Sequence, residues 1–162
     1  MFVVGMHRSG TSAVTEVLGE MGFELPPPDR LVGANDSNPH GHFEVELLVD
    51  LNEEILHRMS GTWAAPPPHL DGSMAPLLDA GLADEAARAF HESFGGPDFL
   101  YKDPRLCLLM PLWRAAVGDH PAVLVVRSPL GTAASMRRRN GLPLEYGLAL
   151  WERYTRSALQ GL

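Results

Sequence analysis

The N-terminal part of the chain passes from an apolar run through a loop of small residues to a segment of helical periodicity. Residues 2–5 form the apolar run, which stops at a glycine, and residues 12–21 carry apolar side chains at helical spacing. This order predicts a strand, a loop and a helix, with Gly22 at the C-terminal end of the helix. The polar stretch 23–42 contains three consecutive prolines and predicts a long loop.

The rest of the chain continues this alternation of strands and helices. Apolar positions at helical spacing predict helices over 43–59, 82–94, 104–117, 129–139 and 142–159. Pro104 is expected in the first turn of its helix, where proline is tolerated. Short apolar runs predict strands over 99–102 and 122–126, and the continuous apolar character of the second indicates a buried strand.

Alternating strands and helices favour an α/β fold, in which helices cover both faces of a central parallel sheet as a three-layer α/β/α arrangement. The length of 162 residues suits one domain. Ligands of such sheets bind outside the carboxyl ends of the strands. Because the predicted strands end at Gly5, Lys102 and Arg127, we expect the functional site where these three residues meet.

Composition and charge exclude several classes of partner. The chain holds 13 lysines and arginines against 20 aspartates and glutamates, a formal net charge of -7. This overall charge disfavours nucleic acid and membrane surfaces, so any bound anion must be held by a local site. The single Cys107 excludes an internal disulfide. Since the first residues do not resemble a signal peptide and no apolar stretch is long enough to span a bilayer, we expect a cytoplasmic protein.

The segment GMHRSGTS, residues 5–12, has the two-glycine spacing of a phosphate-binding loop. Backbone N–H groups in such a loop, together with the helix N-terminus behind it, bind anions. The lysine of nucleoside triphosphate loops is replaced by Thr11, and the cation is Arg8 within the loop. The pattern therefore favours a nucleotide phosphate site over a kinase or triphosphatase; the alternative is a simple glycine-rich turn with a threonine cap.

This loop resembles the 5′-phosphosulfate loop of the sulfotransferase family, in particular its bacterial members, whose fold is like that of P-loop nucleoside triphosphate hydrolases. The resemblance implies that the co-substrate 3′-phosphoadenylyl sulfate (PAPS) is bound by His7, Arg8, Ser9, Gly10, Thr11 and Ser12. The segment AVLVVRSPLGTAAS, residues 122–135, is similar to the family's 3′-phosphate signature and implies that Arg127 and Ser135 bind the 3′-phosphate. A guanidinium and a hydroxyl are good partners for a phosphate dianion. The alternative is a surface arginine that follows a buried strand.

The lysine expected to act on the transferring group is Lys102, the only lysine of the chain. It lies 25 residues before Arg127, a separation that resembles the one between the family's active-site lysine strand and its 3′-phosphate arginine. The resemblance implies that Lys102, with Arg8, stabilises the negative charge that develops during sulfuryl transfer. Cytosolic members carry a histidine base two residues after this lysine, but Pro104 occupies that position here, so their histidine mechanism does not carry over.

A general base is expected in the segment NPHGHFEVE, residues 38–46, which resembles a short motif of bacterial sulfotransferases. The resemblance favours Glu44 as the base, with His42 and Asp103 as alternatives. The structural interpretation of Glu44 is a carboxylate in the first turn of the following helix, where it would favour the helix dipole. No metal is expected, because the histidines lack ligand spacing and arginine and lysine could supply the positive charge.

A run of three arginines, residues 137–139, offers further positive charge near the 3′-phosphate or an acidic acceptor, although charge runs at helix ends are commonly solvated. We expect the loops 23–42 and 61–78 to shape the acceptor pocket, since they flank the strand ends. The chain stops at Leu162, before the glycine- and lysine-rich segment that closes over the nucleotide in many members. We therefore expect a fragment, a compact bacterial form or one domain of a larger protein.

Together these features predict a PAPS-dependent sulfotransferase that acts on a hydroxyl or amine of a small-molecule or carbohydrate acceptor. Two alternatives stay open from the sequence. One is an atypical P-loop kinase, which the absent loop lysine disfavours. The other is an inactive module that binds adenosine 3′,5′-bisphosphate and transfers nothing. The sequence identifies neither the acceptor nor the oligomeric state.

Overall fold

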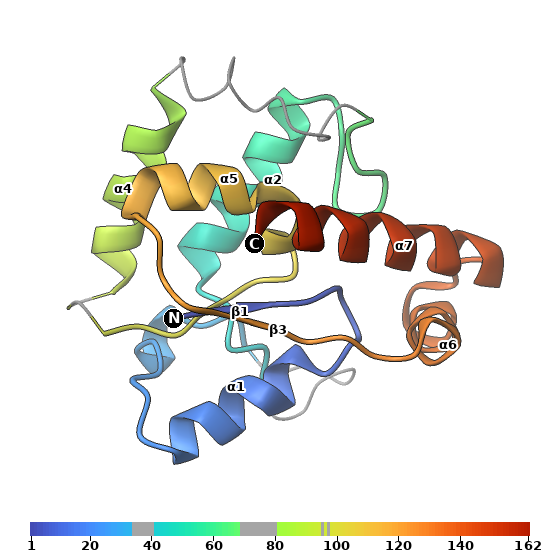
Figure 1. Ribbon diagram of the computed structural model, residues 1–162, viewed down its shortest axis with the longest axis horizontal. Helices are drawn as coiled ribbons and strands as arrows, with labels where there is room; N and C mark the ends of the chain where they lie inside the picture. The colour runs from blue at the N-terminus through green and yellow to red at the C-terminus, as the bar shows by residue number, and fades with distance from the viewer. Residues whose placement is uncertain (34–40, 69–80, 95, 97) are drawn as a thin grey trace.

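A computed structural model describes residues 1–33, 41–68, 81–94, 96 and 98–162 of the chain (Figure 1). In these residues the strands are β1 (Phe2–Val4), β2 (Tyr101–Lys102) and β3 (Ala122–Leu124). The helices are α1 (Thr11–Glu20), the short 3-10 helix η1 (Pro28–Arg30), α2 (Glu46–Arg58), α4 (Leu82–Ser93), α5 (Leu106–Val117), α6 (Pro129–Asn140) and α7 (Leu144–Gly161). Every predicted strand and helix is present, with ends that differ by up to three residues.

The three strands form one parallel sheet in the order β2-β1-β3, which confirms the predicted parallel α/β class. Val3 of β1 pairs with Lys102 on one side and with Val123 on the other. The central strand β1 and the edge strand β2 are both fully buried. The prediction that β3 is buried is wrong: it is an edge strand of intermediate exposure, and the following Val126 is 55% exposed.

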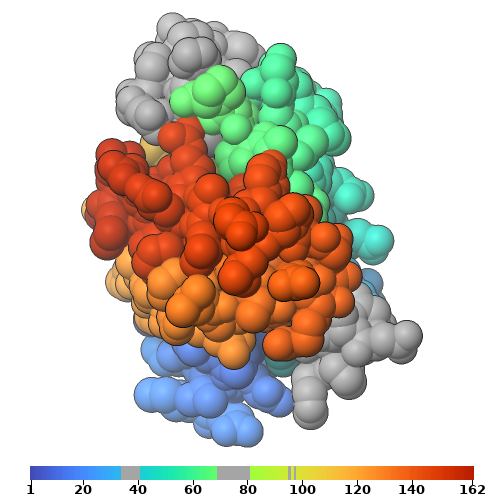
Figure 2. Space-filling view, turned by 90° about the vertical axis from the view of Figure 1, so that its right-hand side faces the viewer, coloured from blue at the N-terminus to red at the C-terminus, as the bar shows by residue number. Residues whose placement is uncertain are grey.

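Helices lie on both sides of this sheet. In Figure 1, α1 lies below the strands and α4, α5 and α7 lie above them, which is consistent with the predicted layering. Figure 2 shows α6 and α7, orange to red, across one end of the molecule with α1 beneath them. The two helices approach closely, because a Cβ on Gly147 would come within 3.0 Å of Ala133.

The hydrophobic core is richest around α5, because most side chains of this helix are apolar and buried. Phe2 of β1, Tyr101 of β2 and Trp113 of α5 are all fully buried, and the rings of Tyr101 and Trp113 meet edge to face at 4.9 Å. Full burial of each such side chain is worth about 1.5–3 kcal/mol. This packing fixes β2 against α5 and therefore fixes the turn between them, which follows Lys102.

Pro104 lies in that turn, two residues before α5 begins, rather than in the first turn of the helix as predicted. The amide of Cys107 donates to the carbonyl of Pro104, so the proline starts the turn that leads into α5. Similarly, α2 begins at Glu46 and not at residue 43, because Val45 forms an isolated antiparallel bridge with Leu31 and keeps an extended backbone.

Candidate functional site

The loop between β1 and α1 has a backbone shape that suits an anion. Arg8 and Gly10 both adopt left-handed conformations, with φ of 67° and 95°. Gly10 precedes α1, and no side chain within the described residues caps that helix. The first N–H groups of α1 therefore face outward with the positive end of the helix dipole behind them. The loop contains a turn closed by the Ser9 amide and the Met6 carbonyl, but Thr11 does not cap the helix as the alternative interpretation expects.

Gly5 makes this loop possible, because it lies where β1 ends against the chain that follows β3. A Cβ at this position would come within 2.6 Å of the Val125 carbonyl oxygen and 2.8 Å of the Thr11 side chain. Those distances exclude every residue except glycine without a shift of the backbone. The carboxyl ends of β1 and β3 are thereby held close together.

A pocket of about 220 Å³ opens at the carboxyl ends of the strands. It is lined by the loop residues His7, Arg8, Gly10, Thr11, Ser12 and Ala13, and by His42, Glu44, Lys102, Pro104, Arg127 and Arg139. The structure thus brings together side chains from all three strand ends, as the sequence predicted. Two predicted binding residues, Ser9 and Ser135, do not line the pocket; both are buried beside it.

Ser135 lies on α6 and is linked to the loop through Arg8. The Arg8 Nε donates a hydrogen bond of 3.0 Å to the Ser135 Oγ. Ser9 instead turns inward, and its hydroxyl donates to the Met6 carbonyl. Ser135 therefore contacts Arg8, which lines the pocket, but does not line the pocket itself. Ser9 stabilises the loop through its hydrogen bond to Met6 and does not face the pocket.

Arg127 follows β3 and is exposed at the rim of the pocket. Its Nη1 donates to the Arg8 carbonyl at 3.2 Å, while its own carbonyl accepts a hydrogen bond of 3.0 Å from Trp151 Nε1. These two contacts tie the predicted 3′-phosphate arginine to the loop on one side and to α7 on the other. The positively charged side chain of Arg127 is consequently a neighbour of the positively charged Arg8.

The pocket concentrates positive charge in a protein whose net charge is -7. Four basic side chains, those of Arg8, Lys102, Arg127 and Arg139, line it together with a single carboxylate. Burial lowers the pKa of Arg8, and repulsion from the nearby arginines adds to that effect. Binding an anion here would relieve that repulsion.

Arg139 is the residue of the arginine run that lines the pocket, whereas Arg137 and Arg138 lie on other parts of the exposed helix end. The sequence could not distinguish the three. Their positions on the last turn of α6 distinguish the three arginines, because successive residues of a helix point about 100° apart. Within the described residues the Arg139 side chain makes no hydrogen bond or ion pair.

Lys102 is 2% exposed, and its ammonium group is surrounded by hydrogen-bond acceptors. Its Nζ donates to the Glu44 Oε1 at 2.5 Å and to the His42 carbonyl at 2.8 Å. A third contact, 3.3 Å long, reaches the Ser12 Oγ. The three donors of the ammonium group are thus all engaged, and they join the loop 5–12 to the segment that carries Glu44.

Glu44 is 8% exposed and precedes α2 by two residues, so the interpretation that it serves the first helical turn is wrong. Its carbonyl accepts from the Val32 amide at 2.8 Å, next to the bridge that holds Val45. Burial raises the pKa of the Glu44 carboxyl, and Lys102 opposes that rise. The result is a carboxylate with a raised proton affinity beside the pocket.

The two alternative bases occupy different surroundings. Asp103 is fully buried, and both its oxygens accept hydrogen bonds: Oδ2 from Asn52 at 3.0 Å, and Oδ1 from the Arg105 amide and Nη1. It does not line the pocket. His42 lines it, and burial followed by the charge of Lys102 lowers its pKa to about 4, so its ring is neutral at pH 7.

His7 also lines the pocket and is held by aromatic rings. Its ring lies 4.8 Å from that of Trp63 and 5.8 Å from that of Tyr154. Burial, reinforced by the charge of Arg105, keeps the pKa of His7 well below 6.5. Within the described residues its buried Nε2 has no hydrogen-bond partner, which leaves a polar atom available to a ligand.

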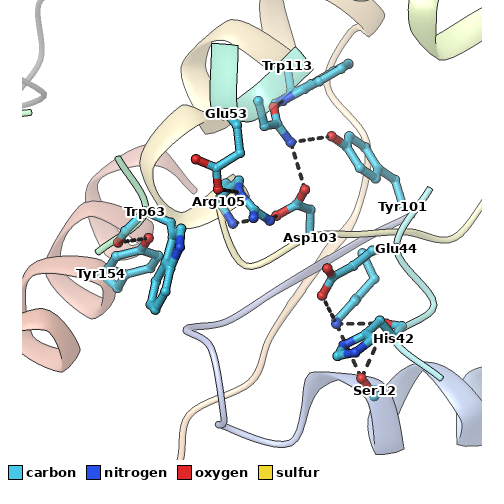
Figure 3. A network of polar contacts seen from close by, with 12 residues as sticks. Ser12, His42, Glu44, Glu53, Trp63, Tyr101, Asp103, Arg105, Trp113 and Tyr154 are labelled. Atoms are coloured by element: carbon cyan, nitrogen blue, oxygen red, sulfur yellow. Dashed lines mark hydrogen bonds and ion pairs between the residues drawn. The ribbon is translucent and has the colours of Figure 1, made fainter. Parts of the chain in front are cut away.

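A buried polar network that sequence reasoning missed links Tyr101, Asp103 and Trp113 at the end of β2 (Figure 3). The Asn52 amide donates to Tyr101 Oη at 2.9 Å and to Asp103, and its oxygen accepts from Trp113 Nε1 at 2.9 Å. Arg105 extends the network to Glu53 through a 2.6 Å ion pair. The available signal was an asparagine on the otherwise apolar face of a helix.

The fold and the pocket define an α/β protein with a pocket lined by basic side chains at the strand ends. A scan against models of known protein families finds no match, and a search among curated proteins finds no relative. Within the described residues, no helix is long and apolar enough to cross a membrane. The same residues hold no group of three or more histidine, cysteine, aspartate or glutamate side chains placed to bind a metal.

Proposed function

We propose that this protein is a cytoplasmic, PAPS-dependent sulfotransferase with a three-layer, P-loop-like fold. The observation that carries the proposal is the meeting of the loop 5–12, Lys102 and Arg127 around one cationic pocket. An anion with two separate phosphate groups suits this arrangement better than a single phosphate would. The loop offers backbone N–H groups and Arg8, while Arg127 offers further positive charge beside the loop at the rim of the pocket.

The residues present fit PAPS as a co-substrate. The phosphosulfate group would lie on the N–H groups at the start of α1 and on Arg8, and the 3′-phosphate would lie on Arg127. Ser135 would take part through its contact with Arg8 Nε or by turning toward the phosphate. PAPS would bring the activated sulfuryl group, and all the remaining chemistry falls to this chain's own side chains.

Glu44 and Lys102 supply that chemistry as a pair. The acceptor oxygen forms a new bond to sulfur while the bond from sulfur to the phosphate oxygen breaks, giving a sulfate ester and adenosine 3′,5′-bisphosphate. Lys102 would move a hydrogen bond from Glu44 to the departing oxygen, where negative charge develops. The same movement frees the Glu44 carboxylate to accept the hydroxyl proton. In one step, Lys102 therefore exchanges its hydrogen bond to Glu44 for one to the departing oxygen, and Glu44 takes up the proton of the acceptor.

The geometry ranks the proposed bases. Glu44 lines the pocket and has a raised pKa, whereas both oxygens of Asp103 are occupied by donors. Neutral His42 is the second candidate, since its ring also lines the pocket. For the inactive module, the prediction is that replacement of Glu44 by glutamine has no kinetic consequence.

Calorimetry with adenosine 3′,5′-bisphosphate, AMP and ATP with magnesium tests the proposal. We expect preference for the bisphosphate, lost on Arg127→Ala and kept in the control Arg138→Ala, whose side chain lies outside the pocket. Preference for ATP with magnesium would instead favour the kinase. If all three nucleotides fail to bind, the proposed function is wrong for this chain.

A further inference from the structure

A second pocket of about 230 Å³ adjoins the pocket at the strand ends, which is called the anion pocket from here on. Its lining comprises His7, Val32, His42, Glu44, Val49, Trp63, Arg105, Arg139 and Asn140. Four of these residues, His7, His42, Glu44 and Arg139, also line the anion pocket, so the two cavities share a wall. Glu44, the proposed base, is part of that shared wall and lines both pockets.

The walls that belong only to the second pocket differ in chemistry from the phosphate site. Val32, Val49 and the half-buried ring of Trp63 form an apolar side, and they come from the loops 23–42 and 61–78 and from α2. Arg105 and Asn140 add polar groups to the rest of this wall. The parts of these loops at 34–40 and 69–78 lie outside the described residues. A flat or ring-shaped molecule suits such a lining, because an indole stacks on ring faces.

The charges of this second pocket do not balance. Arg105 is compensated by Asp103 and Glu53, at 3.0 Å and 2.6 Å. The Glu44 carboxylate is already paired with Lys102. Arg139 has no acidic partner within the described residues, and the neutral His42 and His7 add no negative charge. One guanidinium is therefore left to face a ligand.

We propose that this second pocket binds the acceptor, and that the acceptor is a ring-containing hydroxy acid whose carboxylate is bound by Arg139. The inference rests on the proposed function. In this pose the ring lies against Trp63 and the reacting hydroxyl reaches Glu44, across the wall from the phosphosulfate. The hydroxyl proton passes to Glu44 as the sulfur–oxygen bond forms, as in the reaction already described.

Titrations followed by saturation-transfer NMR test the inference, with the protein first saturated with adenosine 3′,5′-bisphosphate. The probes are two matched pairs: 4-hydroxyphenylacetate against its amide, and methyl glucuronide against methyl glucoside. A charge-assisted hydrogen bond is worth about 1.5–3 kcal/mol, so we expect at least one acid to bind about tenfold or more tightly than its neutral partner. Arg139→Gln should abolish this preference, and the control Arg138→Gln should retain it.

Two results would overturn the inference while the proposed function stands. One is that wild-type protein binds the bisphosphate but neither acid is preferred over its neutral partner. The other is that the acid preference survives Arg139→Gln while bisphosphate affinity falls, which would assign Arg139 to the nucleotide. Failure of the wild-type protein to bind the bisphosphate would overturn the proposed function itself, and the inference with it.

Discussion

Arg8 and Ser135 lie 127 residues apart in the sequence, and the Arg8 Nε donates a 3.0 Å hydrogen bond to the Ser135 Oγ. The arginine belongs to the loop 5–12, which we propose binds phosphate, and the serine to the buried face of α6. A second contact, from Arg127 Nη1 to the Arg8 carbonyl, joins the same two regions. The two segments proposed to bind opposite ends of the co-substrate are therefore already coupled.

Ser135→Ala should weaken binding of adenosine 3′,5′-bisphosphate. Loss of one hydrogen bond of about 0.5–1.5 kcal/mol corresponds to a roughly two- to tenfold higher Kd by calorimetry. Ser157→Ala, a change at a similarly buried serine on α7, is the control and should leave the Kd unchanged. Equal affinities in both variants would show that the Ser135 hydroxyl does not contribute to the nucleotide site.

Lys102→Met should destabilise the fold strongly, because it leaves the Glu44 carboxylate buried without its partner. Breaking a buried pair in this way costs about 3–5 kcal/mol, which urea denaturation would measure as a lower free energy of unfolding. Adding Glu44→Gln to the same variant should recover part of the loss. The exposed pair of Arg58 and Glu54 provides the control, and an equal effect of Arg58→Met would contradict the prediction.

Stability should fall as the pH drops from 6.5 toward 4, in part because of His42. Its folded-state pKa of about 4 lies below the ordinary 6.5, so the unfolded chain binds the proton more readily across this window. The stabilising contribution of neutral His42 is complete above pH 6.5 and is lost as the pH falls. His7 acts in the same direction, and the raised pKa of Glu44 acts in the opposite one.

His42→Gln isolates this contribution, because glutamine does not titrate. The free energy of unfolding, measured by urea denaturation from pH 7 to pH 4, should fall less steeply in the variant than in the wild-type protein. His57→Gln is the matched control for a histidine in the exposed last turn of α2. Parallel wild-type and His42→Gln curves would mean that His42 has an ordinary pKa in the folded protein.

Gly5→Ala should reduce both stability and nucleotide affinity. The added methyl would come within 2.6 Å of the Val125 carbonyl oxygen, and forcing an atom into such packed space costs about 1–3 kcal/mol. Thermal unfolding measures the change. Gly33→Ala is the control, since nothing lies within 4 Å of a Cβ there. Equal unfolding temperatures for the two variants would contradict the close approach of β1 and β3.

Local patterns in the sequence were enough to predict the elements of this fold. Periodicity located the α-helices of the described residues but not the short 3-10 helix η1, which lies in the stretch predicted as a loop, and the glycine loop at 5–12 marked the junction of β1 and α1. What local patterns could not predict were effects of tertiary position. β3 has the composition of a buried strand but lies at the sheet edge, and α2 starts late because Val45 pairs with Leu31.

The same distinction between local sequence pattern and tertiary position applies to the candidate site. Lys102 and Arg127 could be placed near the loop because parallel strands end at one edge of a sheet. The partner of Lys102 could not be predicted, since Glu44 lies 58 residues away on a segment without regular structure. Nor could Arg139 be separated from its two neighbours without the rotation of α6. The network around Asn52 likewise depends on contacts between distant segments.

The contacts of the tryptophans give this protein its own optical reporter. Trp151 donates to the carbonyl of Arg127, and the ring of Trp63 lies against His7 in the pocket wall, whereas Trp113 is fully buried in the core. Indole emission depends on the charges and polarity around the ring. An anion that enters the pocket should therefore shift the fluorescence of Trp151 and Trp63 while the emission of Trp113 stays constant, so occupancy can be followed without a label.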